Sequence, residues 1–253
     1  MNTSLFTAQA TSGGVLERDF LIGDVPGVLW SPLSASPGTP LVLMGHGGGL
    51  HKRSAGLVSR ARDSVLRDGF AVAAIDVPGH GDRPRSVEDQ RWVDSMLAER
   101  AAGQSMAATI AAYNGSLAER AVPEWQTTID MLQELPEIGP DAPIGFSGMT
   151  LASAIGIPLV AADSRITAAI FGGVFVYEAI TRAAEQVTIP IEFLLPWDDT
   201  EISRESGLAL FDVFGSQDKI LHAFPGSHFT VPVERIDTRF FGRHLGGKEA
   251  TIV

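Results

Sequence analysis

A six-residue stretch at positions 144–149, Ile-Gly-Phe-Ser-Gly-Met, constrains the fold of this chain more than any other segment. It follows an Ala- and Pro-rich loop and precedes an apolar segment that runs from residue 150 to residue 162. This order predicts a strand, a sharp turn and a helix, with the hydroxyl of Ser147 at the apex of the turn. Gly145 lets the chain bend tightly, and the amide of Gly148 is expected to point outward at the start of the helix. Such a turn presents a nucleophile beside a donor for an anion.

Three other segments extend the pattern. Upstream, an apolar strand pattern runs into a glycine-rich loop at residues 45–49, whose amides can face a developing oxyanion. Downstream, one strand pattern ends near Asp198 and Asp199, and the next is followed by His228. The order along the chain is therefore glycine loop, serine, acid and histidine.

With these motifs in this order, the chain resembles the α/β-hydrolase superfamily, whose serine, acid and histidine lie on loops after successive strands. The resemblance spans residues 15–245 and is nearest to the small esterase and dienelactone-hydrolase-like branch. It implies an α/β fold in which helices flank a mostly parallel sheet of eight strands. The motifs that carry it are His-Gly-Gly-Gly at 46–49, the loop at 76–82, the turn at Ser147, the acids at 198–199 and Pro-Gly-Ser-His at 225–228.

Hydrophobic periodicity agrees with this fold. Strand patterns occur at residues 15–22, 27–32, 40–44, 71–76, 142–146, 166–175, 190–195 and 219–223. Helical patterns occur at 55–68, 125–134, 150–162, 204–213 and 233–244. With 253 residues, of which 45% are hydrophobic, the chain can bury one large core, and we expect a single domain over residues 1–253.

Residues 83–122 form a long insertion between a glycine-containing loop and the next helix. Its apolar side chains are interleaved with charges, which predicts one or two helices over the edge of the sheet. Two interpretations are open: these helices cover the core, or they form a lid whose apolar side chains contact the substrate.

If the loops converge, the resemblance implies hydrolysis through an acyl-enzyme. Ser147 would attack the acyl carbon, and His228 would take its proton and return it to the leaving group. A carboxylate would orient the imidazole. We favour Asp199, because it precedes the β-branched Ile202 by three residues as in the family pattern; Asp198 is the alternative.

The expected oxyanion donors are the amides of Gly48 and Gly148, with Gly47 as a substitute for the first. The turn departs from the family pattern in one respect: Met149 stands two places after Ser147, where a small residue is usual. A side chain of that size is expected to strain the packing of the helix on its strand. The predicted substrate contacts are Phe146, Met149, Trp197, Phe229, Trp92 and Tyr113.

Composition narrows the class of partner. The formal net charge of −11 argues against nucleic acid and against an anionic membrane surface. The chain has no cysteine, which excludes disulfides and a thiol nucleophile, and its histidines and carboxylates show no metal-ligand spacing. We therefore expect a small acyl substrate and no cofactor or metal ion.

The first residues lack a basic region followed by an apolar stretch, so no signal peptide is expected. The longest apolar run, at residues 166–177, is shorter than the roughly 20 residues that span a bilayer. These features predict a cytoplasmic protein.

Three functions are compatible with the sequence. A carboxylic-ester hydrolase comes first. The same triad could instead act on a thioester, a lactone or a carbon–carbon bond, because the triad does not encode the leaving group. A catalytically silent binding protein of the same fold is the third.

Overall fold

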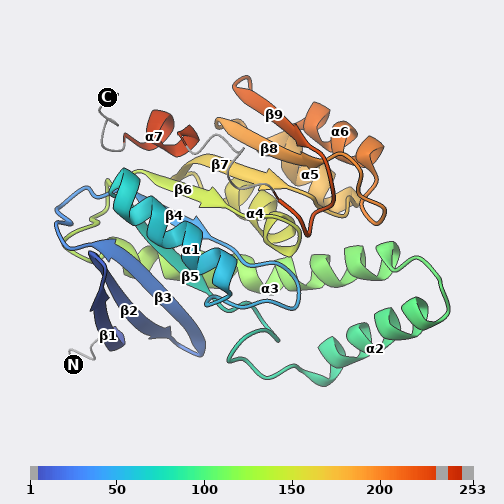
Figure 1. Cartoon of the computed structure of the whole chain (residues 1–253), viewed down its shortest axis with the longest axis horizontal. Helices are drawn as coiled ribbons and strands as arrows, with labels where there is room; N and C mark the ends of the chain where they lie inside the picture. Colours follow the sequence, from blue (N-terminus) through green and yellow to red (C-terminus); the bar gives the residue numbers. More distant parts are fainter. Residues whose placement is uncertain (1–4, 232–238, 247–253) are drawn as a thin grey trace.

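The computed structural model describes residues 5–231 and 239–246. Within them, a nine-stranded sheet runs in the order β1-β2-β3-β5-β4-β6-β7-β8-β9 (Figure 1). The first three pairings in that order are antiparallel and the other five are parallel. The strands are β1 (Phe6–Ser12), β2 (Val15–Ile22), β3 (Val25–Pro32), β4 (Leu41–Met44), β5 (Ala71–Ile75), β6 (Ile144–Ser147), β7 (Ile166–Gly172), β8 (Ile191–Pro196) and β9 (Lys219–Phe224).

Helices cover both faces of the sheet, so the predicted α/β class is confirmed (Figure 1). The helices are α1 (Ala55–Asp63), the π-helical turn η1 (Ser64–Asp68), α2 (Val87–Ala101), α3 (Ala107–Gln133), α4 (Leu151–Ala162), α5 (Glu178–Gln186), α6 (Arg204–Val213) and α7 (Phe240–Leu245). Side chains of β4 alternate between two cores: Leu41 and Leu43 pack with α3, α4, α5 and α6, while Val42 and Met44 pack with α1 and α7.

Several elements differ from the sequence expectation, and α5 is a helix that the sequence did not predict. The ninth strand is β1, which the sequence did not predict because its residues, Phe-Thr-Ala-Gln-Ala-Thr-Ser, are mostly exposed and show no apolar pattern. The predicted helix at 125–134 is the last part of α3, which is 27 residues long. The predicted helix at 233–244 lies partly outside the described residues, and its described part belongs to α7.

The insertion predicted at 83–122 contains α2 and the first half of α3, which form a hairpin that projects from the body of the molecule (Figure 1). The hydroxyl of Ser86 caps α2 by accepting the N–H of Asp89. Asp89 also accepts a hydrogen bond from Arg120 at 2.6 Å, and the ring of Trp92 stacks on that of Tyr113. These contacts fix α2 on α3.

Helix α4 packs closely on β6 because Gly156 leaves room for the ring of Phe146. A methyl group on Gly156 would lie 2.0 Å from Cε1 of that ring. The ring cannot move easily, because it also contacts the rings of Trp125 and Phe171. This contact places the start of α4 relative to the sheet.

Gly156→Ala should therefore destabilise the protein by about 1–3 kcal/mol through overpacking, although alanine is the better helix former. Gly56 in α1 is a matched control, since it is exposed and a methyl group there would meet only Nη1 of Arg60, at 3.6 Å. Gly56→Ala should stabilise the protein by up to about 1 kcal/mol. Urea denaturation of both variants measures the difference, and equal shifts would contradict this packing.

Candidate active site

The predicted functional segments gather at one edge of the sheet. The glycine loop follows β4, the turn into α4 follows β6, the two acids follow β8 and His228 follows β9. These strands are parallel, and the carboxyl ends of parallel strands meet at the same edge (Figure 1).

Asp199 and His228 form a buried pair at this edge. Oδ2 of Asp199 accepts a hydrogen bond from Nδ1 of His228 at 2.6 Å and another from the backbone N–H of His228 at 2.6 Å. Oδ1 accepts the backbone amides of Glu201 at 2.9 Å and Ile202 at 2.8 Å. The side chain of Asp199 is 1% exposed and that of His228 is 7% exposed. Because Nδ1 faces the carboxylate, Nε2 is the ring nitrogen that can exchange a proton with substrate.

The hydrogen bonds keep Asp199 ionised. Burial alone would raise the pKa of its carboxyl, but the amides of His228 and Ile202, the ring of His228 and the amide of Glu201 together hold that pKa below its ordinary value. Asp198 has a different partner: its Oδ2 accepts the N–H of Gly226 at 3.1 Å, which ties the acid loop to the histidine loop. The geometry thus places Asp199, and not Asp198, on the imidazole.

Ser147 does not lie at the turn. It is the last residue of β6, where it pairs with Met44 on one side and Ile170 on the other. Its carbonyl accepts the N–H of Gly45 at 2.9 Å. The amide of the next residue, Gly148, donates to the carbonyl of Ile170 at 3.0 Å, so the expectation that this amide points outward as an oxyanion donor is wrong.

The sharp turn is at Thr150, three residues further on. Thr150 has φ 56° and ψ −119°, and among residues 5–231 and 239–246 no other residue except glycine has positive φ. Helix α4 begins at the next residue. Small residues stand two places before and after it: a methyl group on Gly148 would lie 2.4 Å from Cβ of Ala152.

With the turn centred on Thr150, Met149 no longer stands two places after the central residue, where a small residue is usual. Gly148, Thr150 and Ala152 have the small, hydroxyl, small spacing that a nucleophile turn requires, whereas the sequence interpretation centred the turn on Ser147. The sequence at 148–152, Gly-Met-Thr-Leu-Ala, has this spacing, but it carries threonine at the position where the α/β-hydrolase pattern has serine.

The glycine loop faces this turn. A methyl group on Gly47 would lie 2.9 Å from Oγ1 of Thr150, while one on Gly48 would meet open space. His46 braces the loop: Nδ1 donates to the carbonyl of Gly47 at 3.0 Å, and Nε2 accepts the N–H of Val77 at 3.3 Å. Burial lowers the pKa of His46 to about 4, so the ring is neutral near pH 7.

The predicted substrate contacts separate into three groups. Phe146 is fully buried in the core, so its assignment as a substrate contact is wrong. Trp92 and Tyr113 contact each other within the α2–α3 hairpin.

The other three lie near the histidine and acid loops. The Phe229 ring is 71% exposed, and its centroid is 3.8 Å from that of His228. Met149 and His228 both approach Gly173, and Trp197 lies under the guanidinium of Arg204.

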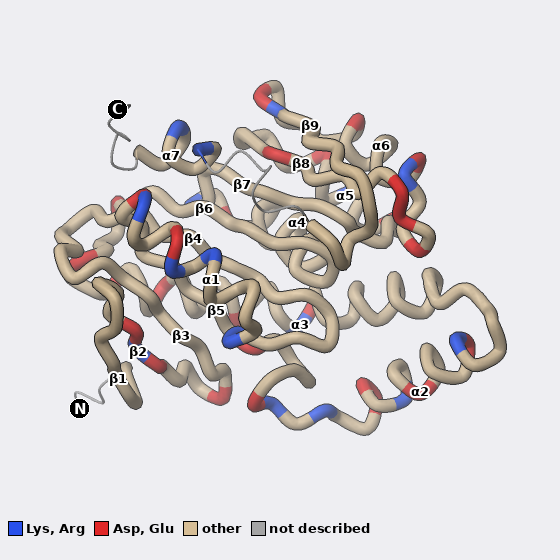
Figure 2. Tube along the Cα trace, in the orientation of Figure 1, with Lys and Arg blue, Asp and Glu red and all other residues tan. Residues whose placement is uncertain are grey.

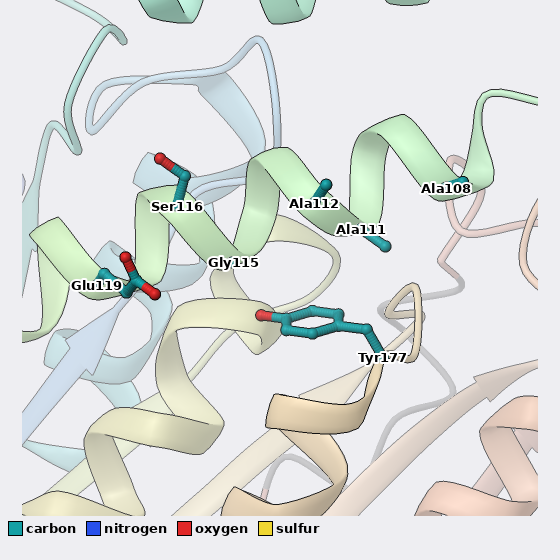
Figure 3. Close-up of a pocket in the computed structure, with 7 residues that line it drawn as sticks. All are labelled: Ala108, Ala111, Ala112, Gly115, Ser116, Glu119 and Tyr177. Atoms are coloured by element: carbon teal, nitrogen blue, oxygen red, sulfur yellow. The ribbon is translucent and has the colours of Figure 1, made fainter.

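Two hollows lie near the α2–α3 hairpin. One, of about 340 Å³, lies between the hairpin turn and the acid loop and is lined by residues that include Met106, Ile110, Phe175, Thr200 and Glu201, next to Asp199 in the chain. Met106 and Ile110 belong to the insertion at 83–122, whose apolar side chains the lid interpretation places on the substrate, whereas the sequence did not single out Phe175, Thr200 and Glu201. The other, of about 470 Å³, lies between α3 and Tyr177 and contains no predicted site residue (Figure 3).

Lys and Arg positions are scattered along the chain among Asp and Glu (Figure 2). In the described part of the chain, no helix is long and apolar enough to cross a membrane. The same residues contain no group of three or more His, Asp or Glu side chains placed to hold a metal ion.

Solved structures of esterases resemble this chain over nearly its whole length. A cold-adapted esterase from an Arctic intertidal metagenomic library is 32% identical, with a TM-score of 0.68, and the match covers 96% of each chain. The chain belongs to the α/β-hydrolase-fold esterases. No protein-family model and no curated protein matches it.

Two more distant α/β hydrolases share the fold. An acetyl xylan esterase from Paenibacillus sp. R4 is 12% identical with a TM-score of 0.66, and the match covers 96% of this chain and 90% of that one. Dienelactone hydrolase from Anabaena variabilis is 18% identical with a TM-score of 0.62, and the match covers 94% and 96%. The resemblance inferred from the sequence motifs is thereby confirmed at the level of the family.

The neutral His46 gives this hydrolase a specific acid sensitivity. With a pKa of about 4 in the folded protein against 6.5 ordinarily, the unfolded chain binds a proton first as pH falls. The neutral ring of His46 makes its full contribution to the free energy of unfolding above pH 6.5. This contribution is lost as pH falls toward 4, by up to about 3 kcal/mol at about 1.4 kcal/mol per pKa unit.

His46→Gln keeps a neutral donor and acceptor, and it should flatten this part of the curve of unfolding free energy against pH, measured by urea denaturation. The matched control is His51→Gln, since His51 is exposed in the same segment and its replacement removes no buried ring. A His46→Gln curve as steep as that of the wild type would contradict this role.

Proposed function

We propose that this esterase-like hydrolase cleaves carboxylic esters of small molecules through an acyl-enzyme, with His228 as the general base and Asp199 as the carboxylate that orients it. The observation that carries the proposal is the 2.6 Å hydrogen bond between Nδ1 of His228 and the buried Asp199, beside a strained turn and a glycine loop. The 32% identity to a cold-adapted esterase supports it.

The reaction starts with a hydroxyl at the end of β6 or in the turn that follows it, either that of Ser147 or that of Thr150. It attacks the acyl carbon while Nε2 of His228 takes its proton. The resulting imidazolium is stabilised by the ionised Asp199, and it then protonates the departing alcohol. Water then attacks the acyl-enzyme while Nε2 of His228 takes a proton from it. Nε2 returns this proton to the hydroxyl of the enzyme, and the acid is released.

The negative charge on the acyl oxygen needs donors that are already in place. The glycine loop approaches the turn at Gly47, where a methyl group would lie 2.9 Å from Oγ1 of Thr150, and we expect the amide of Gly47 or Gly48 to donate to the acyl oxygen. One such donor is typically worth about 2.7–4 kcal/mol of transition-state stabilisation. The neutral His46 holds this loop in place by donating a hydrogen bond to the carbonyl of Gly47.

The hollow beside the acid loop sets the size of the substrate. Its volume of about 340 Å³ is at the lower end of the range for small-molecule sites. Its lining is apolar at Met106, Ile110 and Phe175 and charged at Arg100 and Glu201. An ester with one short alkyl or single-ring group fits this lining.

We expect the purified protein to hydrolyse short-chain nitrophenyl esters and to do so equally well after treatment with a metal chelator. A fluorophosphonate probe should add once, within residues 147–150, and should block hydrolysis. Parallel assays on matched thioesters and lactones test the alternative leaving groups. Activity on thioesters alone would move the assignment to that class, and inactivity on every substrate would favour the silent binding protein.

Asp199→Asn should lower kcat by on the order of 10⁴, because an amide holds the imidazole in the wrong tautomer. Asp198→Asn is the matched control and should cost far less, since Asp198 bonds only the loop amide of Gly226 among its described side-chain contacts. Circular dichroism of both variants verifies folding. A larger loss from Asp198→Asn would assign the orienting role to Asp198.

A further inference from the structure

We propose that the nucleophile of this hydrolase is Thr150 and that Ser147 is a strand residue without a chemical role; this rests on the ester hydrolysis proposed above. The first reason is backbone strain. A β-branched residue at φ 56° is a genuine outlier, and such conformations persist mainly where function requires them. The sharp strand-to-helix turn that exposes a nucleophile is such a place.

The surrounding hydrogen bonds hold Thr150 in this conformation. Its N–H donates to the carbonyl of Gly172 at 3.0 Å, and its carbonyl accepts the N–H of Ala154 at 3.0 Å. The buried hydroxyl of Ser153 donates to the carbonyl of Gly148 at 2.8 Å and accepts the N–H of Gly172 at 2.8 Å. The turn is thus anchored to the end of β7 on both sides of Thr150.

The side chain of Thr150 is not used for helix capping. A threonine before a helix usually accepts an amide of the first turn, but in α4 no such bond is made. Oγ1 lies instead toward Gly47, where a methyl group would be only 2.9 Å away. The hydroxyl is therefore directed at the loop that is expected to bind the oxyanion.

Two other groups required for acyl transfer surround the same turn. The amide of Leu151, the first residue of α4, lies among the helix N–H groups that have no partner within a helix, so it can serve as the second oxyanion donor in place of Gly148. Met149 and His228 approach the same glycine: a methyl group on Gly173 would lie 3.1 Å from Cε of Met149 and 3.2 Å from Cβ of His228. The histidine loop therefore reaches the turn that carries Thr150.

Ser147 lacks these features. Its backbone is paired within β6 on both sides, with Met44 and with Ile170, and the strand pairing continues through the amide of Gly148. Its φ is not in the left-handed region.

The chemical step is balanced by groups already placed. Oγ1 of Thr150 forms a bond to the acyl carbon, and its proton passes to Nε2 of His228. The bond between the acyl carbon and the alcohol oxygen then breaks, and that oxygen takes the proton from Nε2. Water adds to the threonyl ester, gives its proton to Nε2, and Thr150 leaves as the hydroxyl with that proton restored.

Three variants test the assignment. Thr150→Ala should abolish both ester hydrolysis and fluorophosphonate labelling, with a loss in kcat on the order of 10⁴ or more. Thr150→Ser restores a hydroxyl at the turn and should keep both activities. Ser147→Ala removes the same chemical group three residues earlier and should react at close to the wild-type rate. Fragmentation mass spectrometry should place the adduct of the wild-type protein on Thr150.

Folding is separated from chemistry by Thr150→Gly, which relieves the positive φ and should raise the melting temperature while it abolishes hydrolysis. An adduct on Ser147, or loss of activity in Ser147→Ala but not in Thr150→Ala, would overturn the assignment. So would labelling of Thr150→Ser combined with an unreactive wild type. If wild type and Thr150→Ser are both inert toward all esters, the proposed function itself fails.

Discussion

The candidate active site at the carboxyl ends of the parallel strands depends on one strained residue, Thr150, which hydrogen bonds to the sheet hold in place. The N–H of Thr150 donates to the carbonyl of Gly172 at the end of β7. The buried hydroxyl of Ser153 donates to the carbonyl of Gly148 and accepts the N–H of Gly172. Strain of this kind costs about 1–3 kcal/mol and requires a surrounding structure that determines the conformation. The absence of a side chain at Gly148 and the small one at Ala152 permit the close approach of strand and helix that the turn demands.

The same edge of the sheet holds an ionised carboxylate, Asp199, and a neutral imidazole, His46. Asp199 stays ionised because four hydrogen bonds reach its two oxygens, and His228 is fixed through Nδ1. His46 is kept neutral by burial, and it serves only to hold the glycine loop. The two histidines have different partners: the carboxylate of Asp199 faces the ring of His228, whereas the carbonyl of Gly47 and the N–H of Val77 face the ring of His46.

Much of this arrangement could be predicted from the sequence. Apolar runs ending in glycine, acid or histidine showed which loops meet at the carboxyl ends of the strands, and the spacing to Ile202 favoured Asp199, the acid that the structure places on His228. The register of the turn could not be predicted. Ser147 and Thr150 both carry hydroxyls near small residues, and only the hydrogen bond from the N–H of Gly148 to Ile170 of β7 shows that the turn begins after Ser147. Burial of Phe146 depends likewise on Trp125 and Phe171, which are distant in sequence.

A crystal structure of the protein after reaction with a fluorophosphonate would show directly which hydroxyl is the nucleophile. We expect electron density for a phosphorus atom bonded to Oγ1 of Thr150, with its oxygen accepting the amide of Leu151 and an amide of the glycine loop, and with Nε2 of His228 facing the adduct. Phosphorus bonded to Oγ of Ser147 would show instead that Ser147 is the nucleophile.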